Sequence, residues 1–308
     1  MVTRSVKSLD VRGGTGSDKQ PLVTIALPVY NGAATLSVAV HSILMQSFSD
    51  WELIILNDAS TDDSLAVMRS FDDSRIRLVE GEENIGLSAR LNMAMDMARG
   101  EYFARMDQDD ISFPQRLEKQ LAYLQSHPDV DLLSANVVVF EGVDEVLGQW
   151  DVGSGTHEYI CRHPWRGFYM AHPTWMGRLH WFRHYRYRTC ADGAEDQDLL
   201  YRSFRHSHFA CLSEPLLAYR EARVLKKMFR ARMVVLRSLG REALVSGFYV
   251  DAVKILSVQM AKIFADMLRH GLGLHALRNA LLPLDEKTRA EWCDILQKLK
   301  CIQAGERV

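Results

Sequence analysis

The sequence has few cysteines and no motif that would join them. Its five cysteines are an odd number, they are widely spaced, and no Cys-x-x-Cys pair occurs. This argues against a disulfide framework or a zinc ribbon and indicates a reducing compartment. No run of about 18 apolar residues occurs, so no transmembrane helix is expected. Residues 1–20 are polar and rich in Gly and Ser, unlike a signal peptide, and are interpreted as a flexible leader.

Several catalytic motifs are also absent. The sequence contains no Gly-x-x-x-x-Gly-Lys-Ser/Thr, no Gly-x-Ser-x-Gly and no His-Glu-x-x-His. These absences argue against a phosphate-binding loop of the first type, a hydrolase nucleophile elbow and a zinc protease helix. Gly13, Gly14 and Gly16 follow no predicted strand, so they are not a dinucleotide-binding fingerprint.

The composition is that of a folded globular protein, with 47% hydrophobic and 25% charged residues among 308. The net charge of −2 is unevenly distributed. Residues 223–308 hold 16 Lys/Arg and 8 Asp/Glu, whereas residues 1–222 hold 21 and 31. The acidic body argues against a nucleic-acid partner, and the basic C-terminal region calls for a separate explanation.

Short β-rich runs alternate with helical patterns along the first half of the chain. Expected strands are 22–27, 52–57, 76–80, 101–106 and 130–140, and expected helices include 33–47 and 87–98. A helix start with a capping side chain is expected at 60–63. The alternation predicts an α/β fold, Rossmann-like, with a mostly parallel sheet flanked by helices on both faces. Helical patterning returns near Glu195 and dominates after residue 223.

Polar residues follow every early strand, at the edge where ligands bind in open parallel sheets. The most informative group is Asp107-Gln-Asp-Asp110, directly after the fourth strand. Two carboxylates of an Asp-x-Asp at one place repel unless a cation joins them. Mg²⁺ or Mn²⁺, held by carboxylates and substrate phosphates, fits this position. The alternative is a solvated acidic loop.

The other strand-end loops offer donor and acceptor groups. Asp58 is available to accept hydrogen bonds from N–H groups of a ligand, because Ser60 is the better helix cap. Asn84 and Gly86 have an alternative interpretation as a simple turn. Arg90 lies one helical turn further on, where it can reach a phosphate.

The sequence Glu195-Asp-Gln-Asp198 opens a later helix. Acidic residues favour helix N-termini electrostatically, which is one explanation. The other is that one carboxylate is a general base.

Together these loops resemble the bacterial glycosyltransferase family 2, whose fold is called GT-A. The resemblance covers about residues 21–222. Its elements are Val23–Asn31, Leu53–Asp62, Asn84–Gly86, Asp107–Asp110, Ala171–Thr174 and Ala194–Asp198.

The resemblance implies a role for each matched position. Donor-binding positions would be Pro28, Tyr30, Asn31, Asp58, Asn84, Gly86, Arg90 and Asp107. Asp58 would bind the base, Arg90 would lie near the diphosphate, and Asp107 would face the ribose or sugar. Asp109 would bind a divalent metal, Mn²⁺ or Mg²⁺. Asp196 would be the catalytic base, with His172, Thr174 and Glu195 on the acceptor side.

One departure concerns the metal site. Many relatives place a His two or three residues after a final Tyr-Arg, whereas Tyr219-Arg220 is followed here by Glu221-Ala-Arg223. Either Arg220 or Arg223 takes over that role, or the metal has one ligand fewer.

The predicted organisation is a leader (1–20), a GT-A catalytic domain (21–222) and a basic, mostly helical C-terminal region (223–308). Residues 223–241 contain seven Lys/Arg and no acid, interleaved with apolar residues. This pattern is typical of a helix lying on an anionic membrane surface. It equally suits a helix that packs its apolar stripe on the catalytic domain.

The expected function is inverting transfer of a sugar from a nucleotide-diphosphate sugar, with UDP-sugars foremost. The expected acceptor is a glycan or a lipid-linked molecule in cell-surface polysaccharide assembly. The protein would act in the cytoplasm or peripherally at the inner face of the cytoplasmic membrane. The alternatives are a sugar-phosphate nucleotidyltransferase, which would need a Gly-rich basic loop after the first strand, and a non-catalytic sugar-nucleotide binding protein.

Overall fold

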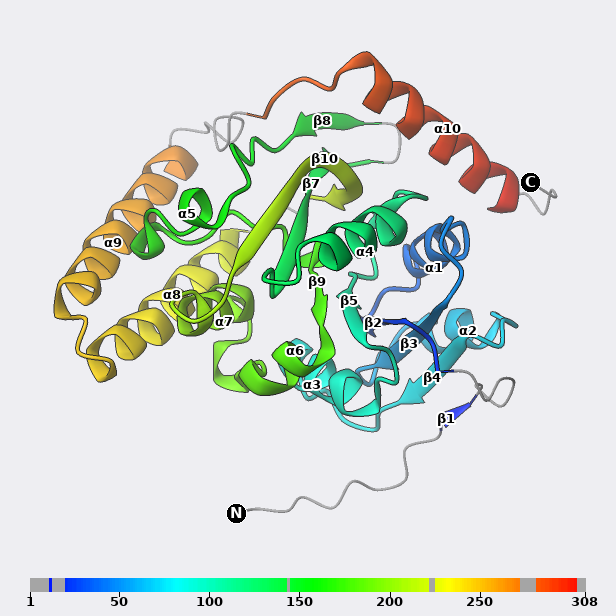
Figure 1. Cartoon of the computed structure of the whole chain (residues 1–308), viewed down its shortest axis with the longest axis horizontal. Helices are drawn as coiled ribbons and strands as arrows, with labels where there is room; N and C mark the ends of the chain where they lie inside the picture. The colour runs from blue at the N-terminus through cyan, green and yellow to red at the C-terminus, as the bar shows by residue number, and fades with distance from the viewer. Residues whose placement is uncertain (1–10, 13–19, 143–144, 222–224, 272–280, 304–308) are drawn as a thin grey trace.

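The computed structural model describes residues 11–12, 20–142, 145–221, 225–271 and 281–303. A ten-stranded sheet crosses its centre, with helices on both faces (Figure 1). The strands are β1 (Val11–Arg12), β2 (Val23–Val29), β3 (Trp51–Asn57), β4 (Ile76–Glu80), β5 (Tyr102–Arg105), β6 (Ile111–Ser112), β7 (Leu132–Phe140), β8 (Val146–Gln149), β9 (Met176–Arg178) and β10 (Phe209–Arg220).

The α-helices are α1 (Leu36–Leu44), α2 (Ser64–Arg69), α3 (Leu87–Met97), α4 (Arg116–Ser126), α5 (His157–Ile160), α6 (Leu179–Tyr185), α7 (Glu195–Ser203), α8 (Leu225–Val245), α9 (Tyr249–Gly271) and α10 (Glu286–Gln303). Three short 3₁₀ helices, η1 (Pro164–Arg166), η2 (His172–Thr174) and η3 (Thr189–Ala191), lie between α5 and α7.

The first half of the sheet is parallel, as the alternating pattern predicts, apart from the short β1, which runs antiparallel to β4. The strand order is β1-β4-β3-β2-β5-β9-β7-β10-β6, with β8 beside β7. Strands β4, β3, β2 and β5 are parallel neighbours. Their carboxyl ends therefore meet at one edge, where the loops predicted to bind a ligand follow.

The second half of the sheet is mixed. Strand β9 runs antiparallel to both β5 and β7, while β7 and β10 are parallel. Strands β6 and β8 add antiparallel pairs at β10 and β7. The antiparallel β9 closes the gap between two parallel groups and carries the chain towards α6 and α7.

Each face of the sheet has its own apolar core, because alternate strand residues point to opposite faces. Leu53 and Ile55 of β3 pack with α1, α2 and α4, whereas Ile54 and Leu56 pack with α3, α6 and α7. This division confirms helices on both faces of the sheet.

Two details of the N-terminal region were not expected from the sequence, namely the first residue of α2 and a short strand within the predicted leader. Helix α2 begins at Ser64, not at residues 60–63, and its N-cap Asp63 makes no side-chain cap bond. Asp62 instead accepts hydrogen bonds from the Ser64 N–H and hydroxyl. Within the predicted leader, Val11–Arg12 pairs with β4. Residues 1–10 and 13–19 lie outside the described ranges.

The C-terminal helices do not form a separate layer. Helix α8 buries Val235, Leu239 and Ala243 in the core that contains α7, and α9 adds Ile255. Helix α10 lies far from these two (Figure 1), where Trp292 packs on Phe113 and Phe140. No helix in the described ranges is both long and apolar enough to cross a membrane.

Candidate active site

The loops after β2, β3 and β5 converge on one pocket of about 270 Å³. Six of the predicted donor or metal positions line it together with three neighbours. The lining residues are Pro28, Val29, Tyr30, Asp58, Leu87, Arg90, Asp107, Gln108 and Asp109. The structure therefore brings together groups that are up to about 80 residues apart in the sequence, at the carboxyl ends of parallel strands. We call this cavity the strand-end pocket.

Asp58 is the most highly connected acid of the strand-end pocket. It accepts hydrogen bonds from the Ile85 and Gly86 N–H groups at 2.8 and 3.0 Å, and from Arg90 Nε at 2.7 Å. Asp58 and Arg90 are both buried. Such a buried, charge-assisted pair fixes the direction of the carboxylate. Arg90 also donates to the Glu83 carbonyl, so it braces Asp58 against the turn before α3.

The predicted residues Asn84 and Gly86 form that turn and do not line the pocket. Gly86 has φ 88°, a backbone conformation that favours glycine. A Cβ there would lie 2.1 Å from Asp192 Oδ2. Gly86 is thus required for the turn that presents its N–H to Asp58.

The loops after β2 and β3 are held by hydrogen bonds between them. Asn31, at φ 51°, donates its N–H to Ser60 Oγ and accepts from the Thr61 N–H. The Gln108 side chain bonds both the N–H and the carbonyl of Tyr30, at 2.8 and 3.0 Å. Asn31 therefore supports the pocket wall, while Tyr30, 48% exposed, remains open to a ligand.

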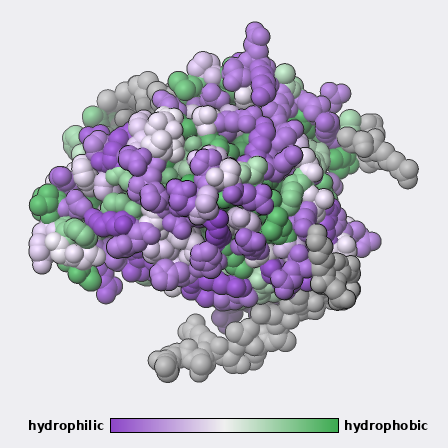
Figure 2. Space-filling view, viewed as in Figure 1, coloured by the Kyte–Doolittle hydropathy of each residue, from purple (hydrophilic) through white to green (hydrophobic). Residues whose placement is uncertain are grey.

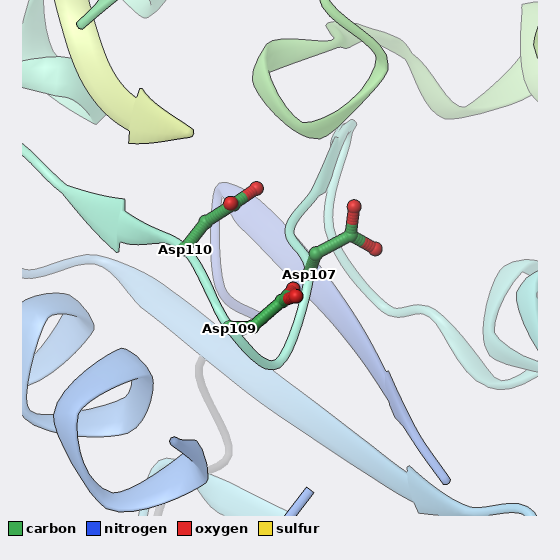
Figure 3. Close-up of side chains that lie close together, drawn as sticks. All are labelled: Asp107, Asp109 and Asp110. Atoms are coloured by element: carbon green, nitrogen blue, oxygen red, sulfur yellow. The ribbon is translucent and has the colours of Figure 1, made fainter. Parts of the chain in front are cut away.

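Three carboxylates project from the single turn after β5 (Figure 3). Asp107, Asp109 and Asp110 each offer an oxygen, and these oxygens lie within 4.8 Å of one another. Burial raises the pKa of Asp109, and the charge of Asp107 raises it further. Burial, Asp107 and Asp109 raise the pKa of Asp110 well above its ordinary value. Like charges this close are unfavourable without a cation.

Asp110 is a candidate metal ligand that the sequence analysis did not assign. Its Oδ1 accepts the Arg220 N–H at 2.9 Å, and its buried Oδ2 has no hydrogen-bond partner in the part of the chain that the structure describes. Arg220 also donates to the Asp109 carbonyl and lies over the Phe140 ring. Arg220, at the end of β10, thus anchors the turn that carries Asp107, Asp109 and Asp110, which we call the acidic turn. Arg223, the other residue considered for this role, lies outside the described residues.

Arg105 is a second residue that the sequence analysis missed. It is buried, and its Nη2 lies 2.5 Å from Asp107. Its Nε and Nη1 have no hydrogen-bond partner among the described residues. Burial acts to lower its pKa, but the charges of Asp107 and Glu195 contribute to a net increase. An arginine within the otherwise apolar strand Tyr102–Arg105 was the available signal, since buried charges are rare without a role.

The three acids of α7 occupy different environments. Asp198 is fully buried and bonds Arg202 and Ser238, so it holds α7 to α8. Glu195 accepts the Gly193 N–H at 2.7 Å. Asp196 instead lines a separate cavity of about 710 Å³, which we call the helical cavity. Burial raises the pKa of Asp196, and Glu195 adds to this. A raised pKa makes a carboxylate a better proton acceptor.

His172 lies between the acids of α7 and the strand-end pocket. Its Nδ1 is 3.6 Å from Glu195, and its Nε2 shares a 2.7 Å hydrogen bond with the Tyr187 hydroxyl. Burial and the positive charge of Arg105 lower its pKa to about 3, so the imidazole is neutral. Asp196 and Asp107 both act on it electrostatically, which links the two cavities through one charge network.

Thr174 has a structural role in the fold. It is fully buried, donates to the Ala171 carbonyl and accepts the Ala135 N–H from β7. Like the other predicted acceptor-side residues, His172 and Glu195, it lines neither cavity. Its side chain joins η2 to the sheet and in this way places His172.

The sequence model of Glycosyl transferase family 2 matches residues 24–186, from β2 to just after α6. The chain belongs to this family. It is 40% identical over 124 residues to EpsE of Bacillus subtilis (strain 168), covering 39% of this chain and 45% of EpsE. It is 36% identical over 103 residues to the Escherichia coli UDP-Glc:alpha-D-GlcNAc-diphosphoundecaprenol beta-1,3-glucosyltransferase WfgD, covering 33% and 41%. The chain thus spans less than half the length of these two relatives.

Two solved structures share the fold. Residues 1–349 of Staphylococcus aureus TarS in complex with UDP superpose with a TM-score of 0.61 at 17% identity, covering 90% of this chain and 79% of that one. The mannosyltransferase PcManGT of Pyrobaculum calidifontis, in complex with GDP-Man and Mn²⁺, gives 0.55 at 16%, covering 97% and 90%. These similarities confirm the GT-A fold expected from the sequence.

Proposed function

We propose that the protein is an inverting, metal-dependent glycosyltransferase. It takes a sugar from a nucleotide-diphosphate sugar and transfers it to a hydroxyl of a glycan or lipid-linked acceptor in cell-surface polysaccharide assembly. The observation that carries this proposal is the pairing of two cavities. The strand-end pocket offers clustered carboxylates, and the helical cavity offers Asp196, with Arg105 and His172 between them.

The donor occupies the strand-end pocket. Pro28 and Tyr30 border the nucleoside, and the Asp58 carboxylate accepts an N–H of the base. Arg90 acts chiefly by holding Asp58, with which it is paired at 2.7 Å. Asp107 faces the ribose or the sugar. Arg105, whose Nε and Nη1 have no partner within the described ranges, supplies positive charge beside the leaving group.

The acidic turn fits a divalent metal. Three carboxylates lie close together there, and one of them carries a buried oxygen without a hydrogen-bond partner among the described residues. Such oxygens are the hard ligands that Mg²⁺ and Mn²⁺ prefer. Asp109 would hold the ion, with Asp107 and Asp110 beside it. The bound ion would neutralise negative charge on the diphosphate.

Asp196 acts as the base. It accepts the proton of the acceptor hydroxyl while that oxygen forms a bond to the anomeric carbon. The bond from this carbon to the diphosphate breaks on the opposite face, and the nucleoside diphosphate leaves with the electron pair. Gln197 orients the base, since its Nε2 donates to Asp196 Oδ2 at 2.9 Å. One base suffices, because the transfer needs no covalent sugar–enzyme intermediate.

The compared proteins support the choice of ligands. TarS was solved with UDP, and PcManGT with GDP-Man and Mn²⁺. The name of WfgD describes a UDP-sugar donor and a diphosphate-linked lipid acceptor. We therefore place UDP-sugars first among the donors and lipid-linked glycans first among the acceptors.

We further propose peripheral contact with the inner face of the cytoplasmic membrane. Helix α8 packs its apolar stripe on the catalytic domain. This supports the second of the two interpretations of residues 223–241, a helix packed on that domain. The α8 residues Arg230, Arg237 and Arg241 are exposed and can meet anionic lipid. Exposed apolar side chains lie at the ends of α8 (Phe229, Leu244 and Val245) and in larger number on α9, at the left margin of the molecule in Figure 2. Those of α9 are Tyr249, Val250, Val253, Leu256, Met260, Phe264, Met267 and Leu268.

Vesicle binding tests this contact. The protein should bind vesicles containing anionic lipid and detach as salt rises, because salt screens the basic residues. Changing Arg230, Arg237 and Arg241 to Glu should abolish binding while nucleotide affinity stays at the parent value. If the protein does not bind these vesicles at low salt, the proposed membrane contact is wrong, and α8 and α9 serve only to pack on the catalytic domain.

A panel of nucleotide sugars tests the enzymatic proposal. We expect slow, metal-dependent release of nucleoside diphosphate and free sugar from at least one donor. Release of sugar 1-phosphate in the presence of pyrophosphate would instead identify a nucleotidyltransferase. Saturable binding of a nucleotide sugar without any turnover, with water or with extracted acceptors, would identify a binding protein.

A further inference from the structure

The helical cavity is the larger of the two and is built mainly outside the family match. Its volume is about 710 Å³, against about 270 Å³ for the strand-end pocket. Residues 166–169 and the start of α7 form one side, and α8 and α9 form the other. The family match ends at residue 186, so both helices lie beyond it. The family match therefore does not by itself imply the chemistry of this wall.

Positive charge predominates in the helical cavity. Arg166, Arg232 and Lys262 line it, together with Asp196 and Asp266. Asp266 pairs with Arg232, whose Nε lies 3.3 Å from Oδ2. The three cations therefore exceed the two acids by one positive charge, which an anionic ligand would balance.

Lys262 is held in place at the junction of the two walls. Its Nζ donates to the Arg166 carbonyl at 2.7 Å. Burial, followed by the charges of Arg232 and Arg166, lowers its pKa to about 8. The charge of Asp266 acts in the opposite direction on this pKa. Two of the three N–H donors of Lys262 have no hydrogen-bond partner among the described residues, so they can meet an anionic ligand.

Gln259 adds a polar group directed to a ligand. It is 1% exposed and lines the helical cavity from α9. Its Oε1 has no hydrogen-bond partner among the described residues. A buried oxygen without a donor is costly, and a ligand hydroxyl would satisfy it.

We propose that the helical cavity binds the acceptor and that this acceptor carries a phosphate group. Lys262 holds the phosphate with Arg166 and Arg232 beside it. Gln259 accepts a hydroxyl of the same molecule, and Asp196 faces the hydroxyl that receives the sugar. This inference rests on the proposed function and specifies its acceptor as a phosphorylated, hydroxyl-bearing molecule.

The test fills the strand-end pocket first and then titrates the helical cavity. The protein is saturated with Mn²⁺ and with UDP or GDP, whichever it binds, and titrated calorimetrically with butyl phosphate, butyrate or butanol. Butyl phosphate should bind and butanol should not. Lys262→Met should weaken the binding of butyl phosphate at least about tenfold, since a charge-assisted hydrogen bond is lost. Lys262→Arg should restore most of the affinity.

Lys254 provides a matched control on the same helix. Its Nζ lies 4.0 Å above the Trp165 ring, so it ties α9 to η1 as Lys262 does, but it does not line the cavity. Lys254→Met should therefore leave butyl phosphate affinity unchanged. An equal loss in both variants would show that Lys262 only packs α9.

The remaining outcomes are also decisive. Absence of butyl phosphate binding to the nucleotide-filled protein, or equal binding to Lys262→Met, would overturn the acceptor assignment while leaving the donor site intact. If butyrate binds as tightly as butyl phosphate, the site does not select phosphate, and the assignment of a phosphorylated acceptor would be wrong. If neither nucleotide binds, the proposed function fails, and the acceptor assignment fails with it.

Discussion

The two cavities of this protein are built in different ways. The strand-end pocket consists of short loops between neighbouring parallel strands, tied to one another by Asp58, Asn31 and Gln108. The helical cavity consists of the 166–169 segment and two long helices from the end of the chain. The first is a local consequence of the sheet, whereas the second depends on long-range packing. We infer that donor recognition is fixed by the fold and that acceptor recognition is set by the C-terminal helices.

The largest effect should come from the base that lines the helical cavity. Asp196→Asn should slow transfer at least about a hundredfold, because the acceptor hydroxyl loses its proton acceptor. Nucleotide affinity should stay near the parent value, since Asp196 does not line the strand-end pocket. Transfer assays with calorimetric nucleotide titrations check both parts.

Glu195→Gln is the matched control for Asp196→Asn. Glu195 is already committed to the Gly193 N–H, which a glutamine oxygen can still accept. Transfer by Asp196→Asn within about tenfold of the parent would move the role of base to another acid of α7.

The next effect concerns the metal in the strand-end pocket. Asp109→Asn should weaken nucleotide binding by about tenfold or more and remove its dependence on Mn²⁺, because the carboxylate holds the cation against the diphosphate. UDP titrations with and without Mn²⁺ measure this. Mn²⁺-dependent affinity equal to that of the parent would show that Asp109 is not a metal ligand.

A smaller effect should follow from removing the hydrogen bonds that join the loops of the strand-end pocket. Gln108→Ala removes two hydrogen bonds to the Tyr30 backbone, each contributing on the order of 1 kcal/mol. We expect nucleotide affinity to fall about threefold to tenfold, with Mn²⁺ dependence retained. Unchanged affinity would mean that the Tyr30 loop is held by other contacts.

The smallest effect is on stability. Asp110→Asn should raise the melting temperature of the metal-free protein by roughly 2–4 °C, as expected for about 1 kcal/mol. It removes a buried like charge, and its Oδ1 can still accept the Arg220 N–H. Because the folded pKa of Asp110 is raised, the folded protein binds more protons than the unfolded chain above about pH 4. Stability of the parent should therefore fall as pH rises through this window.

The pH dependence gives the control for Asp110→Asn. The advantage of the variant should be small near pH 4 and grow towards neutral pH, and Mn²⁺ should stabilise it less than the parent. A metal-free variant that melts below the parent at pH 7 would contradict the proposed charge repulsion.

The sequence predicts the strand-end pocket well because its signals are local. Strand β4 has the expected bounds, and the polar loops follow the strands that position them. Asp110 and Arg105 were missed because their role depends on burial and on partners such as Arg220. The helical cavity was not predicted, since no pattern shows that α9 packs on η1 or that Lys262 reaches the Arg166 carbonyl. The inward-facing stripe of α8 likewise required the structure.

The stereochemistry of the first-formed sugar tests the central claim most directly, namely that Asp196 activates the attacking hydroxyl on the face opposite the diphosphate. Water can replace the acceptor, so the anomer released from a UDP-α-sugar can be followed by NMR before it equilibrates. We predict the β anomer, formed with Mn²⁺ by the parent and at least about a hundredfold more slowly by Asp196→Asn. Release of the α anomer, or equal rates for the two proteins, would contradict the account.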